Sequence, residues 1–280
     1  MLKIGELNEL KVLRKTDIGY MLTDGKEEVL LHNNETNFQK LEAGQTVETF
    51  IYYDHKARLA ATLSKPIITT NRPGFVVVKD LHETLGVFVD NGTSKDMLVS
   101  KDFLPYDQTL WPQVGDKLYC ILRHKNRLTA KPLNKVDIDL RPENPLKLGD
   151  KVTAYVIHSG HEGLNLITQE GHKLFVHHTQ MREKHRMGEE LEVRIARITP
   201  GDYSGSLIET KEIMMDKDAV MLEEFLKKHG RMALTADSDK EAIDAAFGLS
   251  KKAFKRALGR LYSERKVIFE NGETIWIKGE

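Results

Sequence analysis

Residues 85–90 read LGVFVD and residues 97–100 read MLVS, and this pair of short patterns decides the fold. Runs of β-branched, aromatic and other apolar residues bounded by turn residues indicate short strands. Gly86 lies inside the first pattern, where glycine is typical of a bulge or of the sharp bend that a small barrel needs. A turn at Gly115 follows, and residues 117–122, KLYCIL, begin a hairpin.

The same pattern occurs three times along the chain, at a spacing of about 70 residues, which is enough for a small β-barrel in each copy. The first copy has IGYML at residues 18–22, VLLH at 29–32 and a turn at Gly44, and the third has EGLNL at 162–166, LFVH at 174–177 and a turn at Gly188. A hairpin completes each copy. Five short strands with these turns predict a closed barrel of OB type.

The last part of the chain follows a different period. Apolar residues from Ala219 to Leu226 are spaced for a helix, and a second helix follows a cap at Ser238 or Asp239. A third helix begins after Ser250, and Asn271-Gly272 marks a β-hairpin. The apolar side of the third helix is expected at Phe254, Leu258, Leu261 and Tyr262. This order of elements predicts a winged helix-turn-helix domain.

Proline-containing joints and the change of period predict the domain boundaries. A proline follows Lys65, residues 141–145 read RPENP, and helical spacing begins after about residue 214. The expected domains are three barrels at residues 1–65, 66–142 and 143–213, and a winged helix at residues 214–280.

The bulk composition limits the class of protein. The chain has 280 residues, 40% of them hydrophobic and 30% charged, which suits two to four folded domains rather than a disordered chain. Basic and acidic residues both total 42, so a nucleic-acid partner would need local clusters of positive charge. The single cysteine, Cys120, excludes an internal disulfide and a four-cysteine zinc site, and it is expected to be buried in a strand. The start of the chain has no signal-peptide pattern and no segment suits a bilayer crossing, so a cytoplasmic protein without membrane contact is expected.

The repeated motifs resemble the RNA-binding repeat of the ribosomal protein S1 type, which usually reads Phe-Gly-Ala-Phe-Val and then Glu-Gly-Leu-Val-His. Phe88 matches the second aromatic of that motif in the middle copy, whereas the first copy has Met21 there and the third has Asn165. His32 and His177 match the motif histidine, and Val99 is expected at that place in the middle copy.

Three such repeats followed by a winged helix resemble the conserved virulence factor B family of Gram-positive bacteria. The resemblance implies a multidomain, mainly β chain with three tandem OB-fold barrels of S1 type and an α+β winged-helix domain. It also implies binding of single-stranded RNA with a preference for pyrimidines, and a regulatory role in virulence gene expression. RNA-processing or ribosomal proteins are further candidate partners.

A protein that binds single-stranded RNA needs rings on which bases stack and cations along the backbone. The candidate rings on the barrels are Tyr20, His32, Phe88, Phe175 and His177, with Tyr52 and Tyr53 beside them. The candidate cations at the hairpins are Lys56 and Arg58, then Arg123, Lys125 and Arg127 beside His124, then Arg194 and Arg197. Those on the third helix of the tail are Lys251, Lys252, Lys255, Arg256 and Arg260. Core packing is the alternative for the rings, Phe175 above all, and a solvated surface is the alternative for the cations.

Catalytic and metal chemistry find little support in the sequence. Histidines crowd one region, at His158, His161, His172, His177, His178 and His185, but their spacing fits no zinc motif. No phosphate-binding loop or nucleophile elbow occurs, so neither an enzyme nor a cofactor is expected. Three alternatives stay open: a DNA-binding regulator that acts through the winged helix, a nuclease that uses the third repeat, and an adaptor whose tail binds a protein while the barrels hold RNA.

Overall fold

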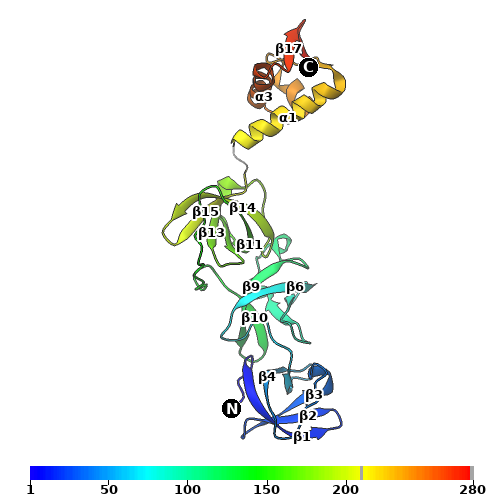
Figure 1. Cartoon of the computed structure of the whole chain (residues 1–280), viewed down its shortest axis with the longest axis vertical. Helices are drawn as coiled ribbons and strands as arrows, with labels where there is room; N and C mark the ends of the chain where they lie inside the picture. Colours follow the sequence, from blue (N-terminus) through cyan, green and yellow to red (C-terminus); the bar gives the residue numbers. More distant parts are fainter. Residues whose placement is uncertain (209–210, 278–280) are drawn as a thin grey trace. The chain divides into compact units, whose positions relative to one another are not determined.

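The computed structural model describes residues 1–208 and 211–277, and side chains from Lys217 onward in the tail. The chain divides into two compact units, Met1–Leu207 and Ile208–Glu280 (Figure 1). The first unit holds three β-barrels in tandem and the second is the tail domain. The predicted fold class is therefore confirmed, while the finer boundaries expected at residues 65, 142 and 213 stay predictions.

Barrel 1 is a closed sheet of five strands in the order β1-β2-β3-β5-β4. Its strands are β1 (Leu7–Thr16), β2 (Gly19–Thr23), β3 (Glu28–His32), β4 (Thr46–Tyr53) and β5 (Leu59–Thr62), and a short 3-10 helix, η1 (Asn33–Glu35), follows β3. β3 and β5 pair in parallel and the other pairs are antiparallel. The core is filled by apolar side chains that alternate inward, such as Leu10, Leu22 and Leu31.

Barrel 2 repeats this plan as a five-stranded sheet in the order β10-β9-β6-β7-β8, whose edge strands β8 and β10 contact one another. Its strands are β6 (Gly74–His82), β7 (Gly86–Asp90), β8 (Met97–Ser100), β9 (Lys117–His124) and β10 (Leu128–Pro132), with 3-10 helices η2 (Lys101–Phe103) and η3 (Gln108–Leu110). Cys120 lies fully buried in β9, as expected, and burial raises the pKa of its thiol.

Barrel 3 closes in the order β11-β12-β13-β15-β14, which matches barrel 1 strand for strand. Its strands are β11 (Lys151–Ser159), β12 (Gly163–Thr168), β13 (Lys173–His177), β14 (Glu190–Thr199) and β15 (Asp202–Ser206), and η4 (His178–Gln180) follows β13.

Two glycine positions recur in every barrel. The turn glycines Gly44, Gly115 and Gly188 have φ values of 87°, 95° and 83°, and the backbone N–H of each donates to the carbonyl of a valine on the first strand. Gly86 and its counterparts Gly19 and Gly163 begin the second strand, where a Cβ would lie 2.1 Å from a carbonyl oxygen of the third strand. Only glycine allows this close approach, so the sequence pattern marks the barrel corner correctly.

Barrels 2 and 3 are joined by both polar and apolar contacts. The backbone N–H of Lys117 in β9 donates to the Gly188 carbonyl (3.1 Å), and Lys117 Nζ donates to the Tyr155 hydroxyl (2.9 Å). Tyr119, Ile157 and Ile167 form one shared cluster of buried side chains. The joint thus fixes one barrel against the next.

The tail domain has the predicted winged-helix order. Its elements are α1 (Lys211–His229), β16 (Arg231–Met232), α2 (Lys240–Phe247), α3 (Lys251–Ser263), β17 (Val267–Glu270) and β18 (Glu273–Trp276). Ser250 caps α3, since its hydroxyl accepts from the Ala253 N–H (3.2 Å). The short strand β16, which pairs with β18, was missed by the sequence. Tyr262 was expected on the apolar side of α3, but 56% of it is exposed, and it stacks on Phe269 instead.

No helix in the described part of the chain is both long enough and apolar enough to span a membrane.

Candidate nucleic-acid interface

Strand alternation decides which side chains the second strand of each barrel turns outward. In β2, Tyr20 and Leu22 point into the core and Met21 is partly exposed. The Tyr20 side chain is only 5% exposed, and its hydroxyl accepts a hydrogen bond from the Leu41 N–H (3.4 Å). The prediction that Tyr20 stacks on a base is therefore wrong, because the ring belongs to the core of barrel 1.

The outward positions of the second and third strands face each other in register and form what we call the outer face of each barrel. Met21 pairs with Leu30 on barrel 1, Phe88 with Leu98 on barrel 2, and Asn165 with Phe175 on barrel 3. The outer faces comprise Met21, Leu30 and His32 on barrel 1, Phe88, Leu98 and Ser100 on barrel 2, and Asn165, Phe175 and His177 on barrel 3. Phe175 is half-buried here rather than in the core.

The last residue of the third strand caps a 3-10 turn in all three barrels. Nδ1 of His32 accepts from the Asn34 N–H (3.2 Å), and Nδ1 of His177 accepts from the Thr179 N–H (3.4 Å). Ser100, not Val99, is the counterpart on barrel 2, where its hydroxyl accepts from the Asp102 N–H (3.4 Å). Val99 is fully buried, so its expected alignment with the histidines is wrong by one residue. Both histidine rings remain exposed.

Barrel 3 gathers further rings beside its outer face. The centroids of His177 and His178 lie 4.1 Å apart, those of Phe175 and His177 6.3 Å, and those of His161 and His178 6.5 Å. His161 and His178 were noticed in the sequence only as metal candidates. Their place on two neighbouring loops, at the start of β12 and the end of β13, makes them part of a ring surface.

Two further histidines of the crowded region, His172 and His185, have structural partners. His172 is buried between the Thr168 hydroxyl (3.0 Å) and the Asn144 carbonyl (2.7 Å), and His185 lies 3.3 Å from the Glu189 carboxylate. Within residues 1–208 and 211–277, no group of three or more His, Cys, Asp or Glu side chains is placed to hold a metal ion.

The hairpin between β9 and β10 carries the densest group of cations on the barrels. Arg123, Lys125 and Arg127 are exposed, and together with Phe103 they line a shallow depression of about 360 Å³. His124 turns to barrel 1, where its Nε2 lies 3.3 Å from the Tyr53 hydroxyl.

The equivalent hairpin of barrel 1 is partly neutralised. Arg58 donates to Asp54 Oδ2 through Nε (2.9 Å) and Nη2 (2.7 Å). Backbone N–H donation and this guanidinium lower the pKa of Asp54 to about 2. Lys56 is exposed at the tip, and Tyr52 is buried at its base. Arg58 is thus less available to a phosphate than Arg127.

The two candidate cations of barrel 3 differ in exposure. Arg197 is exposed on β14, beyond a register shift between Ile195 and Arg197. Arg194 is half-buried, and its Nε has no hydrogen-bond partner among the described residues.

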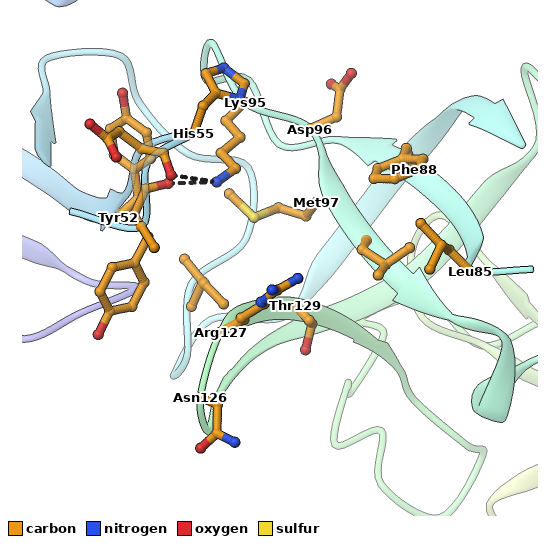
Figure 2. A pocket seen from close by; sticks show the side chains of 15 residues that line it. Tyr52, His55, Leu85, Phe88, Lys95, Asp96, Met97, Asn126, Arg127 and Thr129 are labelled. Carbon is orange, nitrogen blue, oxygen red and sulfur yellow. Dashed lines mark hydrogen bonds between the residues drawn. The ribbon is translucent and has the colours of Figure 1, made fainter. Parts of the chain in front are cut away.

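A cleft of about 420 Å³ lies between the hairpin of barrel 1 and the outer face of barrel 2 (Figure 2). Phe88, Met97 and Leu98 line it from barrel 2, and Tyr52 lines it from barrel 1. Lys95 bridges the two barrels, since its Nζ donates to the carbonyls of Tyr53 (2.7 Å) and Asp54 (3.2 Å). The sequence did not indicate this cleft, because it exists only where two barrels meet.

The tail domain presents a separate basic surface on α3. Lys252, Lys255, Arg256 and Arg260 are exposed on this helix, and Lys251 is half-buried. Two of these cations have acidic neighbours: Arg260 donates to Glu264 (2.9 Å), and Lys255 lies 3.9 Å from Asp237. Lys252 and Arg256 are thus the less neutralised members of this surface.

Comparison with known proteins agrees with this architecture. An S1 domain family matches residues 4–64, a family described as the CvfB first S1-like domain matches residues 74–131, and a CvfB-like winged helix domain matches residues 205–275. The protein YitL of Bacillus subtilis is 38% identical over 276 residues, which cover 96% of this chain and 92% of YitL. Conserved virulence factor B of Staphylococcus haemolyticus is 30% identical over 280 residues, covering 96% of this chain and 93% of that protein.

A solved structure extends the likeness to three dimensions. It is a multidomain protein with nucleic acid binding domains from Streptococcus pneumoniae, which is 28% identical, superposes with a TM-score of 0.65 and covers 98% of both chains.

Proposed function

Because this chain belongs to the conserved virulence factor B family, we propose that it is a non-catalytic, cytoplasmic protein that binds single-stranded RNA. In this proposal, binding has low sequence specificity with a preference for pyrimidines, and it regulates gene expression, virulence genes among its targets. S1 domains and winged helices are types of domain that bind nucleic acids. That the nucleic acid is RNA is the part of the proposal that goes beyond the domain types.

The observation that carries the proposal is the pairing of rings and cations on the barrels. The outer faces of barrels 2 and 3 present the half-buried rings of Phe88 and Phe175 and the exposed ring of His177. Arg123, Lys125 and Arg127 extend from the hairpin next to the outer face of barrel 2. Unpaired bases stack on such rings at about 1–3 kcal/mol per base without requiring a sequence. Tyr20 is left out of this interface because it is buried.

The test is the affinity of the full chain for oligo-U at increasing salt. Each phosphate contact on a single strand should contribute about −0.7 to the slope of log K against log salt. A slope several times that value, with weaker binding to oligo-A, supports the proposal. Affinity that is absent at all salt concentrations, or that does not change with salt, contradicts it.

A second candidate function is binding of duplex DNA by the tail domain. The exposed cations of α3 favour it, because the third helix of a winged helix-turn-helix enters a groove or lies on phosphates. Competition between duplex DNA and single-stranded RNA for the full chain separates the two functions. If duplex DNA displaces RNA and binds more tightly, a DNA-binding regulator is the better account.

The non-catalytic part of the proposal has its own test. Labelled RNA incubated with the protein and Mg²⁺, Mn²⁺ or Zn²⁺ should remain intact. Cleavage that disappears when His177 and His178 are replaced would favour a nuclease in barrel 3.

A further inference from the structure

The outer face of barrel 1 has a pocket of its own, beside the hairpin between β4 and β5. Its volume is about 300 Å³, at the lower end of the range of about 300–1,000 Å³ that is typical of small-ligand sites. Leu30, Leu59 and Ala60 make its walls apolar, while Tyr52 and Glu35 add polar groups. A space of this size suits one long side chain better than a base with its sugar and phosphate.

The three barrels differ at the residue that ends the 3-10 helix after the third strand. This residue is Glu35 in barrel 1, Phe103 in barrel 2 and Gln180 in barrel 3. An acidic side chain therefore takes the place of a ring or an amide only in barrel 1. A carboxylate repels a phosphate and attracts a cation, so this position favours a different ligand on barrel 1.

The outward strand residues of barrel 1 also differ from those of its neighbours. Met21 pairs with Leu30 on barrel 1, whereas Phe88 and Phe175 belong to the equivalent pairs of barrels 2 and 3. Barrel 1 thus presents aliphatic side chains where the other two barrels present rings. Such a wall suits the methylene groups of a long, charged side chain, which pack on apolar surface.

The charges that line the pocket leave one carboxylate without a cation. Arg58 donates to Asp54 Oδ2 through Nε (2.9 Å) and Nη2 (2.7 Å), so these two charges cancel. Glu35 is half-buried and forms no ion pair with the side chains that the structure describes. Burial raises the pKa of the Tyr52 hydroxyl, a hydrogen bond with Ser94 acts against this shift, and the nearby Glu35 and Asp54 carboxylates add to it. The lining residues therefore make the pocket negative.

An exposed ring follows Glu35 on the same segment. Phe38 is fully exposed, and it lies in a turn in which the Gln39 N–H donates to the Thr36 carbonyl (2.9 Å). The φ values of Asn37 and Phe38 are 49° and 63°, a combination that favours glycine at the second of these positions. A cation binds over the face of such a ring. Phe38 lies at most about 11 Å along the chain from Glu35, so one extended peptide reaches both.

We propose that barrel 1 docks a basic peptide segment of a partner protein. One arginine of the segment enters the pocket, with its methylene groups against Leu30 and Leu59 and its guanidinium at the Glu35 carboxylate. A second basic side chain of the segment lies over the Phe38 ring. The inference goes beyond the proposed RNA binding, because it assigns the first barrel to a protein partner.

The experiment is an NMR titration of the full chain with a short capped peptide that carries three arginines separated by glycines. The same peptide with citrulline, which keeps the shape of arginine and removes its charge, is the control ligand. Amide shifts are expected at residues 30–38 and 58–61 with the arginine peptide only, and they should weaken as salt is added. An arginine peptide that shifts neither range, or a citrulline peptide that shifts them equally, overturns the proposal.

Two variants test the pocket. Glu35→Gln should weaken binding of the arginine peptide about tenfold, the size expected for loss of a charged hydrogen bond. Glu42→Gln is the matched control, because Glu42 is exposed on the same barrel outside the pocket and the change in net charge is equal. Leu30→Lys places an ammonium group in the pocket and should abolish binding, while thermal unfolding checks that the variant is folded. Equal affinities of Glu35→Gln and Glu42→Gln would overturn the assignment of the pocket.

Phe38→Gly separates docking from stability. Glycine adopts a positive φ without strain, so this variant should not unfold more easily in denaturant. Loss of the ring should weaken the arginine peptide about two- to fivefold, the size of an exposed cation–π contact. Unchanged peptide affinity overturns the contact with the ring.

RNA is the competing ligand for the same face. If oligo-U shifts the amides of residues 30–38 and Glu35→Gln strengthens its binding, the pocket belongs to the RNA path and the proposal is wrong. If the arginine peptide shifts these amides and oligo-U does not, the two ligands occupy separate barrels, as proposed. The peptide titration contains no RNA, so its result is independent of whether the proposed RNA binding holds.

Discussion

Arg186 of barrel 3 donates two hydrogen bonds to Asp116 of barrel 2, from Nε to Oδ2 at 2.7 Å and from Nη2 to Oδ1 at 2.9 Å. Asp116 is buried, and its Oδ2 also accepts from the Gln113 N–H (2.7 Å). The pair raises the pKa of Arg186, chiefly through the hydrogen bonds to Asp116. One ion pair therefore joins the turn of one barrel to the turn of the next.

Replacing Arg186 with alanine should loosen this joint. The buried Asp116 carboxylate would lose its cation, which costs about 1–3 kcal/mol for a charged hydrogen bond. We expect a lower free energy of unfolding in urea and more frequent hydrogen exchange at Lys117 and Gly188. Lys147→Ala, at an exposed residue of barrel 3, is the control. Equal unfolding free energies of the two variants would show that the Arg186–Asp116 pair contributes nothing to stability.

Gly86→Ala should destabilise barrel 2 severely. A Cβ there would lie 2.1 Å from the Val99 carbonyl oxygen, and φ is 127°. Gly115→Ala is a matched control, because it also has positive φ, 95°, but a Cβ there meets nothing within 4 Å. We expect the control to lose about 1–2 kcal/mol of unfolding free energy, from backbone strain alone. Gly86→Ala should lose clearly more in denaturant unfolding. Similar losses in both would mean that the strand corner relaxes.

The outer-face histidines can be tested with the residue that barrel 2 uses instead. Since Ser100 caps its turn as His32 and His177 cap theirs, His32→Ser and His177→Ser should keep the turn and remove only the ring. We expect little change in thermal stability. RNA affinity should fall about fivefold or more, the lower end of one base-stacking contact. Unchanged affinity in the double variant would exclude these rings from the interface.

Triple charge reversal of Arg123, Lys125 and Arg127 should weaken RNA binding equally for all sequences. Loss of three phosphate contacts should reduce the magnitude of the salt slope by about 2. The measurement is affinity for oligo-U and oligo-A at several salt concentrations. Triple reversal of Lys3, Lys26 and Lys40, which are exposed on barrel 1, controls for net charge. If both triple variants lose affinity alike, the hairpin has no special role.

The Asp54 carboxyl should titrate at about pH 2, because backbone N–H groups and the Arg58 guanidinium donate to its charged form. Its folded-state pKa lies below the ordinary value of 3.8. The stabilisation is therefore complete above about pH 4 and is lost as the pH falls through about 2. Carboxyl NMR shifts measured against pH test this value. A midpoint near the ordinary value would show that the pair with Arg58 is not formed in solution.

The sequence predicted the architecture because turn glycines and strand spacing are local signals. Gly44, Gly115 and Gly188 mark the same turn in each copy, and Asn271-Gly272 marks the wing hairpin. The orientation that the sequence predicted for the Tyr20 side chain was wrong because residues 19–22 are almost all apolar. No alternation of polar and apolar residues there distinguishes inward from outward positions. Only the pairing of β2 with β3 decides that Tyr20 lies opposite the buried Leu31.

The candidate site was less predictable, because its geometry depends on contacts between distant residues. Ser100 aligns with the histidines through its register opposite Gly86 and through the 3-10 turn that follows it. The difference between Arg58 and Arg127, both at hairpins, comes from Asp54, since no carboxylate of the described side chains forms an ion pair with Arg127. Lys95 gave no signal in the sequence, since its partners are backbone carbonyls of another barrel.

The joint between barrels 2 and 3 also has a consequence for the length dependence of the proposed RNA binding. Because Lys117 and Gly188 share a backbone hydrogen bond, the outer faces of these two barrels keep a constant spacing. Under the proposed function, oligonucleotides shorter than this spacing would occupy one face at a time and longer ones would engage both. Avidity should then rise in a step at a threshold length rather than gradually with each added nucleotide.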